Sequence, residues 1–372
     1  MSSDRHLNYF LAKARTAAGL IEFYEEVEMD KRYALVLALI VFVPSISSTV
    51  LGAERTVTVT DEAGRAVEVP HPPERIVCLV PAAAEVIYAL DESHRMVGRT
   101  DDCDMPPALL EKPSVGTASN RVNVELILDL NPDLVIGRTG ALFPEEIEEQ
   151  IEINGVPVLR YRALQLSTLF PMIADLGLIL KKEDEAEELG DYVYDYYETI
   201  RERVKPLAEE DKPRVYFMSM GHIDWTGGAD SAGSERITEA GGVNVAEDLP
   251  GSLAYVSREW ILEEDPDVIL YSRVSSSGDI PTVEDYEKTV EEKILSEPGF
   301  SDLASVRTGR IYLFDISMAS GFTEIVTYLQ FAQWFHPQLF ADVDPEAVHR
   351  EIFEKYFDME LEGTWAYQRQ MI

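Results

Sequence analysis

Arginine and aromatic residues recur at the ends of the predicted strands of this chain. Arg138, Arg162 and Arg273 follow runs of β-forming residues, and Trp225 and Tyr255 accompany them in the second half. The planar guanidinium group of arginine suits carboxylate, hydroxamate and phosphate groups. Tryptophan and tyrosine rings cover an apolar or macrocyclic ligand face. These residue types therefore indicate ligand binding through charged groups and a flat or apolar surface.

Ligands of open α/β sheets bind outside the carboxyl ends of the strands, so the residues that follow each predicted strand are the candidates. The predicted ligand-binding residues are Arg99, Arg138, Tyr161, Arg162, His222, Trp225, Tyr255, Arg273 and Met318. In so acidic a chain, each arginine has the alternative of a salt bridge with a nearby carboxylate. His222 with Asp224 is a conceivable metal-binding pair, but a lone histidine is more often an ordinary loop residue, and no metal site is predicted.

The common catalytic motifs do not occur in the sequence. It contains no nucleotide-binding glycine loop, no Gly-x-Ser-x-Gly elbow, no His-Glu-x-x-His and no Cys/His cluster at zinc spacing. We therefore predict no catalytic residues, no cofactor and no enzymatic activity. Because an enzyme without these motifs is conceivable, an enzymatic alternative is kept below.

A repeat in the sequence predicts the elements that position the candidate residues. Residues 124–136 return, with similar residue types, as residues 258–270. Each copy has a glutamate at its second position (Glu125 and Glu259), then a Pro-Asp pair and a short apolar run. A helix must stop before the proline because the pre-proline residue is biased out of the α conformation. The apolar run is typical of a strand buried on both faces, so the unit predicts two similar α/β lobes.

The chain is expected to form an N-terminal lobe from residues 54–166 and a C-terminal lobe from residues 208–372. Strand and helix patterns alternate in both, which predicts a central parallel sheet flanked by helices in each lobe. Residues 167–207 carry only helical periodicity, and residues 183–206 form one candidate helix. Such a helix would be roughly 35 Å long and would join the lobes stiffly.

The composition of the chain restricts the classes of partner that it can bind. The chain has 372 residues, of which 46% are hydrophobic and 27% charged, and its formal net charge is −36. This charge argues strongly against nucleic acid, because a polyanion would be repelled. The two cysteines, Cys78 and Cys103, are too few for a disulfide framework. Cys78 lies in an apolar run that predicts a core position, and a bridge to Cys103 stays open.

Residues 29–53 have the pattern of a secretory signal. Lys31 and Arg32 precede the apolar run 33–43, and small residues follow it. Residues 1–28 are then expected to be a non-native extension, and the choice of Met1 or Met29 as the start stays open. The alternative is an uncleaved membrane anchor, since the uncharged stretch barely reaches the ~20 residues that a span needs. No cysteine follows the apolar run, which argues against a lipid anchor. In either case we expect export to the periplasm or the cell surface.

Several motifs, in order, resemble one known family. They are residues 74–85, Val115-Gly116, the two Asn/Asp-Pro-Asp units and the Ala-Gly-Gly-Val-Asn of residues 240–244. Together they are similar to the substrate-binding proteins of ABC importers for iron–siderophores, haem and vitamin B12, from about residue 54 to the C-terminus. The resemblance implies two lobes joined by one long helix and a metal chelate held in the cleft between them. It also implies a monomer that delivers this ligand to a permease dimer with its ATPase subunits.

In that family a surface glutamate on each lobe docks onto arginines of the permease. The resemblance implies Glu85 for the first lobe. In the second lobe the family position is Thr238 here, and of its neighbours Glu235 and Glu239 we favour Glu239. Three alternatives stay open: a chelatase-like enzyme of similar two-lobe fold, a binder of oxyanions such as molybdate, which the arginines would suit, and a sensor that binds ligand without transport.

Overall fold

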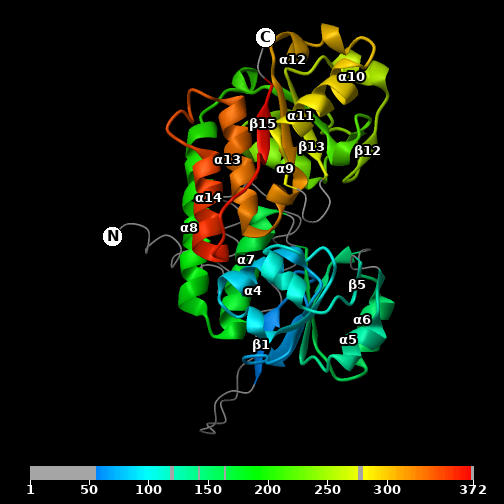
Figure 1. Ribbon diagram of the computed structural model, residues 1–372, viewed down its shortest axis with the longest axis vertical. Helices are drawn as coiled ribbons and strands as arrows, with labels where there is room; N and C mark the ends of the chain where they lie inside the picture. Colours follow the sequence, from blue (N-terminus) through cyan, green and yellow to red (C-terminus); the bar gives the residue numbers. More distant parts are fainter. Residues whose placement is uncertain (1–55, 118–120, 141–142, 163–164, 275–279, 370–372) are drawn as a thin grey trace.

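The computed structural model describes residues 56–117, 121–140, 143–162, 165–274 and 280–369. Two α/β lobes lie one above the other, and a layer of helices runs along one side of both (Figure 1). The predicted extension and the predicted signal or anchor, residues 1–53, lie outside the described residues. Within the described ranges, no helix combines the length and the apolar character that crossing a membrane requires.

The N-terminal lobe is built on a four-stranded parallel sheet of order β4-β3-β7-β8. Its strands are β3 (Ile76–Cys78), β4 (Met96–Arg99), β7 (Leu134–Arg138) and β8 (Val158–Tyr161), with the helices α4 (Pro81–Ala89), α5 (Val124–Asp129) and α6 (Glu145–Glu152) around them. The hairpin of β1 (Thr56–Thr60) and β2 (Ala66–Pro70) precedes the sheet, and a short ribbon pairs β5 (Gly116–Thr117) with β6 (Arg121–Val122). The strands are rich in Val, Ile and Leu because helices cover both faces of the sheet.

The C-terminal lobe has a five-stranded sheet of order β11-β9-β13-β14-β15, in which only β15 is antiparallel. Its strands are β9 (Arg214–Met218), β11 (Val243–Asn244), β13 (Val268–Arg273), β14 (Ile311–Asp315) and β15 (Ala366–Gln368). The helices are α9 (Ala232–Glu239), α10 (Arg258–Glu264), α11 (Val283–Thr289) and α12 (Ala304–Arg307). The predicted fold class, α/β with central parallel sheets flanked by helices, is confirmed.

Four helices form the layer beside the two sheets. They are α7 (Leu166–Leu180), α8 (Glu183–Val204), α13 (Glu324–Phe335) and α14 (Pro345–Phe357). The predicted long helix is α8, and its 22 residues run along both lobes (Figure 1). Acidic residues fill its first turn and two arginines lie in its last turn, which complements the helix dipole at both ends.

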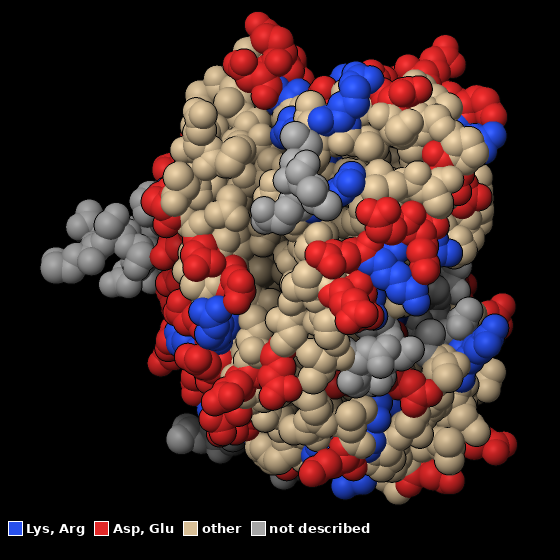
Figure 2. Space-filling view, turned by 45° about the horizontal axis from the view of Figure 1, so that its top comes forward, with Lys and Arg blue, Asp and Glu red and all other residues tan. Residues whose placement is uncertain are grey.

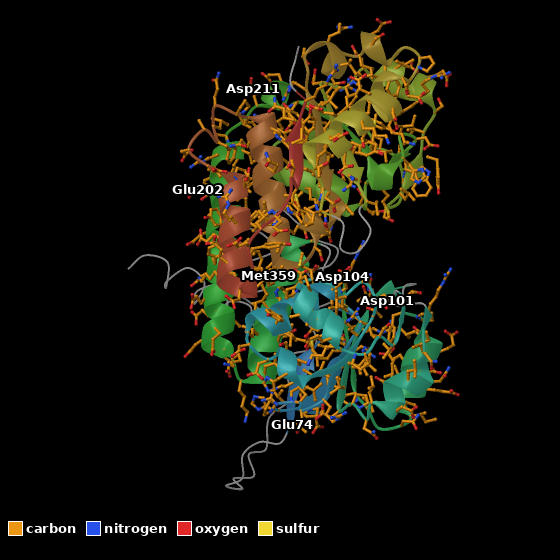
Figure 3. All side chains as sticks on the ribbon, in the orientation of Figure 1. Glu74, Asp101, Asp104, Glu202, Asp211 and Met359 are labelled. Carbon is orange, nitrogen blue, oxygen red and sulfur yellow. The ribbon has the colours of Figure 1, made fainter. Side chains whose placement is uncertain are left out.

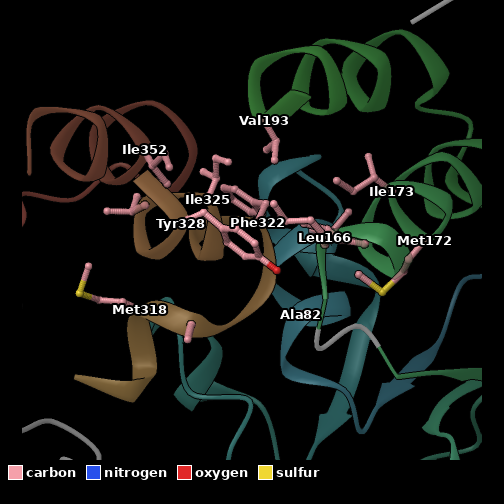
Figure 4. Close-up of a cluster of buried hydrophobic side chains, with 14 of the residues drawn as sticks. Ala82, Leu166, Met172, Ile173, Val193, Met318, Phe322, Ile325, Tyr328 and Ile352 are labelled. Atoms are coloured by element: carbon pink, nitrogen blue, oxygen red, sulfur yellow. The ribbon is translucent and has the colours of Figure 1, made fainter. Parts of the chain in front are cut away.

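The connection between the lobes is broader than the single stiff helix that the sequence predicts. One hydrophobic core continues from the first lobe into the second. Figure 4 shows members of this core from both lobes, among them Ala82 of α4, Ile173 of α7, Ile325 of α13 and Ile352 of α14. Because packed side chains interlock like a crystal, this shared core stabilises the two lobes as one body. We call it the joint.

The repeat has the predicted form in both lobes. Its copies are α5 with β7 and α10 with β13. The residue before each proline, Asn131 or Asp265, takes left-handed dihedral angles, with φ of 46° and 40°. The clash with proline disfavours the right-handed region, and Asn and Asp tolerate the left-handed one better than most residues. Each helix therefore ends before this residue, α5 at Asp129 and α10 at Glu264.

The aspartate after each proline ties the unit to the neighbouring strand. Asp133 accepts a hydrogen bond from the backbone N–H of Arg75, at 2.9 Å, just before β3. Asp267 accepts the equivalent bond from the backbone N–H of Arg214, also at 2.9 Å, at the start of β9. The repeated Pro-Asp pair is therefore part of the scaffold of both lobes.

Candidate ligand-binding site

The carboxyl ends of both sheets point toward the space between the lobes. In Figure 3, Glu74 and Asp211, which precede the first strand of each sheet, lie at the outer ends of the molecule. Asp101 and Asp104, which follow β4, lie on the edge that faces the other lobe. The strand ends at which the candidate residues were predicted therefore lie on the sides of the lobes that face one another.

Three of the predicted residues meet on the C-terminal lobe. His222 stacks on Trp225 with ring centroids 3.9 Å apart and an angle of 12° between the planes. The ring of Tyr255 contacts that of Trp225 edge-on, with ring centroids 5.3 Å apart. The two residues are direct partners in the pairing of β10 (Trp225–Thr226) with β12 (Ala254–Tyr255). His222 is exposed and Tyr255 is 68% exposed. We call these three residues the aromatic platform.

The arginines at the strand ends are already bound to other groups. Arg138 forms an ion pair with Asp102 and donates from Nε to the carbonyl oxygen of Leu79, at 3.1 Å. Arg273 lies 3.3 Å from the carboxylate of Asp315, which is fully buried. The alternative of intramolecular salt bridges is therefore realised at both positions.

Arg162 differs from these two because its residue is exposed. Its backbone N–H donates to the carboxylate of Glu62. Its guanidinium group also acts across the gap between the lobes, since its charge is among those that lower the pKa of Glu235 on α9. Burial is the largest influence on that carboxyl group and raises its pKa to about 7. Arg162 is thus the predicted arginine that the structure leaves most accessible to solvent.

Three predicted residues lie in the interior. Arg99 is 6% exposed and donates to the carbonyl oxygens of Leu109 and Thr100, both at 2.9 Å. Tyr161 is 2% exposed and donates to Asp175 at 3.0 Å, and burial raises its pKa well above the usual range. Met318 lines a cavity of about 20 Å³ at the joint, too small for any chelate. These residues build the lobes and do not face the space between them.

Neither predicted docking glutamate projects freely from the surface. Glu85 is 3% exposed, and its Oε1 accepts a hydrogen bond from Ser320 at 3.1 Å. The expectation that it lies on the surface is wrong, because α4 presses it against Gly321, where an added Cβ atom would lie 2.0 Å from its Oε2. Glu239 is partly buried and accepts a hydrogen bond from Tyr197 at 2.9 Å. A docking role of Glu239 stays a prediction.

The repeat contains two exposed glutamates that are not among the predicted docking residues. Glu125 lies in the first turn of α5 and Glu259 in the first turn of α10, and both are exposed. Figure 1 shows α5 and α10 on the same side of the molecule, away from α8. The sequence already related these two glutamates to each other, since each is the second residue of its repeat copy.

Charge and cysteine chemistry complete the description. Acidic side chains are spread over the visible face of the molecule and basic ones form small groups among them (Figure 2). Cys78 and Cys103 are both free and buried, and no disulfide joins them. The core position predicted for Cys78 is confirmed. In the described ranges, His, Cys, Asp and Glu side chains form no group of three or more that would hold a metal ion.

Known proteins resemble this chain in sequence and in structure. An uncharacterized ABC transporter substrate-binding lipoprotein of Bacillus subtilis is 25% identical over 77% of this chain and 87% of its own length. A cobalamin-binding protein of Halobacterium salinarum is 27% identical over 58% of each chain. The structure of the molybdate periplasmic binding protein MolA of Haemophilus influenzae, bound to molybdate, has a TM-score of 0.68 and 21% identity. It covers 82% of this chain and 99% of its own.

The family follows from a match over most of the folded region. The model of the periplasmic binding protein family matches residues 76–316, which is more than half of the chain. This range begins at β3 and ends just after β14, so it contains the parallel strands of both sheets, the α8 helix and the repeat, and β15 lies beyond it. The chain belongs to the periplasmic binding protein family.

Proposed function

We propose that this protein is the exported substrate-binding component of an ABC importer, and that it binds a metal chelate between its lobes without chemical turnover. The aromatic platform is the observation that carries this proposal. A stacked histidine and tryptophan with a tyrosine edge suit the flat face of a macrocycle. The family and the Bacillus relative support the class of function.

The charges at the facing edges favour a ligand with little or no negative charge. Arg138 and Arg273 pair with carboxylates, and an oxyanion would have to compete for them. Three aspartates, Asp101, Asp102 and Asp104, follow β4 on the edge of the N-terminal lobe, and their charge repels an anion. We therefore favour a cobalamin-type chelate, whose corrin ring carries neutral amides, over molybdate and over haem with its two carboxylates.

The relatives support the class of function and do not rank the ligands, since they include both a cobalamin-binding and a molybdate-binding protein. The Halobacterium relative is a cobalamin-binding protein and matches 58% of this chain. MolA shares the fold at 21% identity, which supports the architecture and not the choice of ligand. The chelatase-like alternative has no comparable support from the aromatic platform, and a sensor would bind the same ligand.

Isothermal titration of the purified protein tests the proposal. We expect cyanocobalamin to bind with one-to-one stoichiometry and a Kd at or below about 1 µM, and to be recovered unchanged. Molybdate and haemin, titrated in the same buffer, should bind far more weakly. Tight binding of molybdate with no binding of cyanocobalamin would overturn the ligand class, and metal insertion into a porphyrin would favour the enzymatic alternative.

Delivery to a permease requires contacts on both lobes. We propose Glu125 and Glu259 for this role, because they are exposed, equivalent by the repeat and on one side of the molecule. The double variant Glu125→Ala, Glu259→Ala should keep the ligand affinity and lose transport in reconstituted vesicles.

The matched control for this pair is Asp129→Ala with Glu263→Ala. It removes the same two charges from exposed positions near the other ends of α5 and α10. The control should transport normally. Equal transport by the docking variant and the control would refute the assignment and return attention to Glu239.

A further inference from the structure

A short segment between β9 and β10 carries the histidine of the aromatic platform. We call residues 219–224 the platform loop. Its backbone includes the turn η5 (Ser219–Gly221), which follows the carboxyl end of β9. Met220 in this turn is 52% exposed, although methionine gains free energy from burial. An apolar side chain held in water at a strand end suits contact with a ligand.

Three hydroxyl groups bind the backbone of the platform loop. Tyr271 donates to the carbonyl oxygen of Gly221 at 2.8 Å, and Tyr216 donates to that of Ile223 at 2.6 Å. Ser272 accepts from the backbone N–H of Met220 at 2.7 Å. The three side chains come from β9 and β13, the two neighbouring central strands of the sheet. Three residues of this six-residue loop, Met220, Gly221 and Ile223, are thus tied to the central strands.

The hydrogen bonds hold a backbone conformation that the loop would not prefer alone. Met220 has φ of 53° and ψ of 39°, in the left-handed region. A residue with a Cβ atom is strained there by roughly 1–2 kcal/mol, and methionine has no polar side-chain atom to form a local hydrogen bond. Residues held in such conformations cluster at ligand clamps and active sites. The Ser272 hydroxyl compensates this strain at the strained residue itself.

The far end of the loop is fastened as well. The carbonyl oxygen of Asp224 accepts a hydrogen bond from the N–H of Val256 at 3.0 Å, and Trp225 pairs with Tyr255 in the adjoining ribbon. His222 therefore lies between two fixed points, and its stacking on Trp225 is set by the backbone on either side. The geometry of the platform is therefore set by contacts within the protein itself.

We propose that Tyr216, Tyr271 and Ser272 are positioning residues that hold the platform loop, so that Met220 and the aromatic platform form a preformed surface for the flat, uncharged face of the ligand. The use of this surface rests on the proposed function. A surface that is already ordered does not lose conformational entropy when ligand binds, which increases affinity. The three hydroxyls act through the loop and do not touch the ligand.

Fluorine NMR of the full chain labelled with 5-fluorotryptophan tests the positioning without any ligand. The chain has four tryptophans, and Trp225→Phe assigns the resonance of Trp225. Tyr271→Phe and Ser272→Ala each remove one hydroxyl, and each should shift or broaden the Trp225 resonance. The resonances of Trp334 and Trp365, far from the loop in sequence, should keep their positions and report that the variants are folded.

Tyr312→Phe is the matched control. Its hydroxyl also donates to a backbone carbonyl, that of Trp334 at 3.3 Å, from β14 of the same sheet. This variant should move the Trp334 resonance, because the two rings stack 4.7 Å apart, and should leave Trp225 unchanged. An unchanged Trp225 resonance in both Tyr271→Phe and Ser272→Ala overturns the positioning role, whatever the ligand is.

Titration with cyanocobalamin then links the loop to binding. We expect Tyr271→Phe and Ser272→Ala to raise the Kd about five-fold each, and Tyr312→Phe to leave it unchanged. Wild-type Kd values in variants whose Trp225 resonance has moved would overturn the link between loop and ligand. Failure of the wild-type protein to bind cyanocobalamin would count against the proposed function, while the NMR result would still decide the positioning.

Discussion

The two lobes share one helix–turn–strand unit and present different chemistry at the ends of their strands. On the N-terminal lobe, β7 ends in Arg138, paired with Asp102, beside Asp101 and Asp104. On the C-terminal lobe, the corresponding edge carries the aromatic platform, with Met220 exposed beside it. A repeated sequence thus encodes a repeated scaffold and leaves the loops after the strands free to differ. The contrast teaches that both edges carry an arginine paired with a carboxylate, that the N-terminal edge adds further aspartates and that the C-terminal edge adds a group of rings.

At the joint the two lobes are alike, because each contributes a buried carboxyl group. Glu85 of α4 lies against Ser320 and Gly321, and Glu324 of α13 forms a buried ion pair with Arg236 at 2.8 Å. Burial raises the pKa of Glu85 to about 8 and the pKa of Glu324 to about 7. Cys103, Asp104 and Glu324 add to the shift at Glu85, while the Ser320 hydroxyl opposes it.

The largest expected effect is the dependence of stability on pH at this joint. A carboxyl group whose pKa rises on folding favours the folded state fully below its unfolded pKa of about 4.5, and this contribution is lost as pH rises through 7 to 8. For Glu85 the loss is on the order of 3 kcal/mol. Urea unfolding at pH 5 and pH 8 measures it.

Glu85→Gln separates this effect from the repulsion of the whole acidic surface. The variant keeps the size of the side chain and cannot ionise, so its free energy of unfolding should fall less between pH 5 and pH 8 than that of the wild type. A fall of equal size in both proteins would show that Glu85 ionises freely and that the joint does not bury its charge.

The next effect tests the aromatic edge directly. Trp225→Ala removes the central ring of the aromatic platform, which contacts both His222 and Tyr255. Because buried aromatic contacts dominate binding energies, we expect the Kd for cyanocobalamin to rise by ~30-fold. Trp365→Ala serves as control, since Trp365 is partly buried like Trp225 and packs on His349 and Phe353 of α14. Similar losses in both variants would mean that the effect is one of folding.

The smallest effect concerns the charged edge. Asp102→Asn keeps the shape of its side chain and removes the charge that neutralises Arg138. We expect a weak affinity for molybdate to appear, with a Kd of about 1 mM, and little change in the affinity for cyanocobalamin. Asp101→Asn removes an equal charge from an exposed neighbour and should not create this affinity. Equal molybdate binding by both variants would show that the pairing of Asp102 with Arg138 is not what excludes an anion from this edge.

Local sequence signals determined much of the fold. The Pro-Asp units, the apolar runs and the helical periodicity of residues 183–206 correspond to α5–β7, α10–β13 and α8. They succeeded because strands buried on both faces, pre-proline stops and amphipathic helices are properties of neighbouring residues. The sequence predicted that His222, Trp225 and Tyr255 belong to one lobe, since all three follow predicted strands there. It did not predict their contact, which depends on the pairing of β10 with β12.

Only the tertiary structure decided which charged residues are available. Asp102 reaches Arg138 from a loop 36 positions earlier, and Ser320 reaches Glu85 from 235 positions later. Burial and ion pairing depend on such distant partners, and no local pattern of residue types contains them. The sequence by itself therefore determined two lobes of one kind and the edge at which a ligand would bind. The packing of those lobes decided that Arg138 and Arg273 are paired, that Glu85 is buried and that the rings of His222 and Tyr255 are exposed.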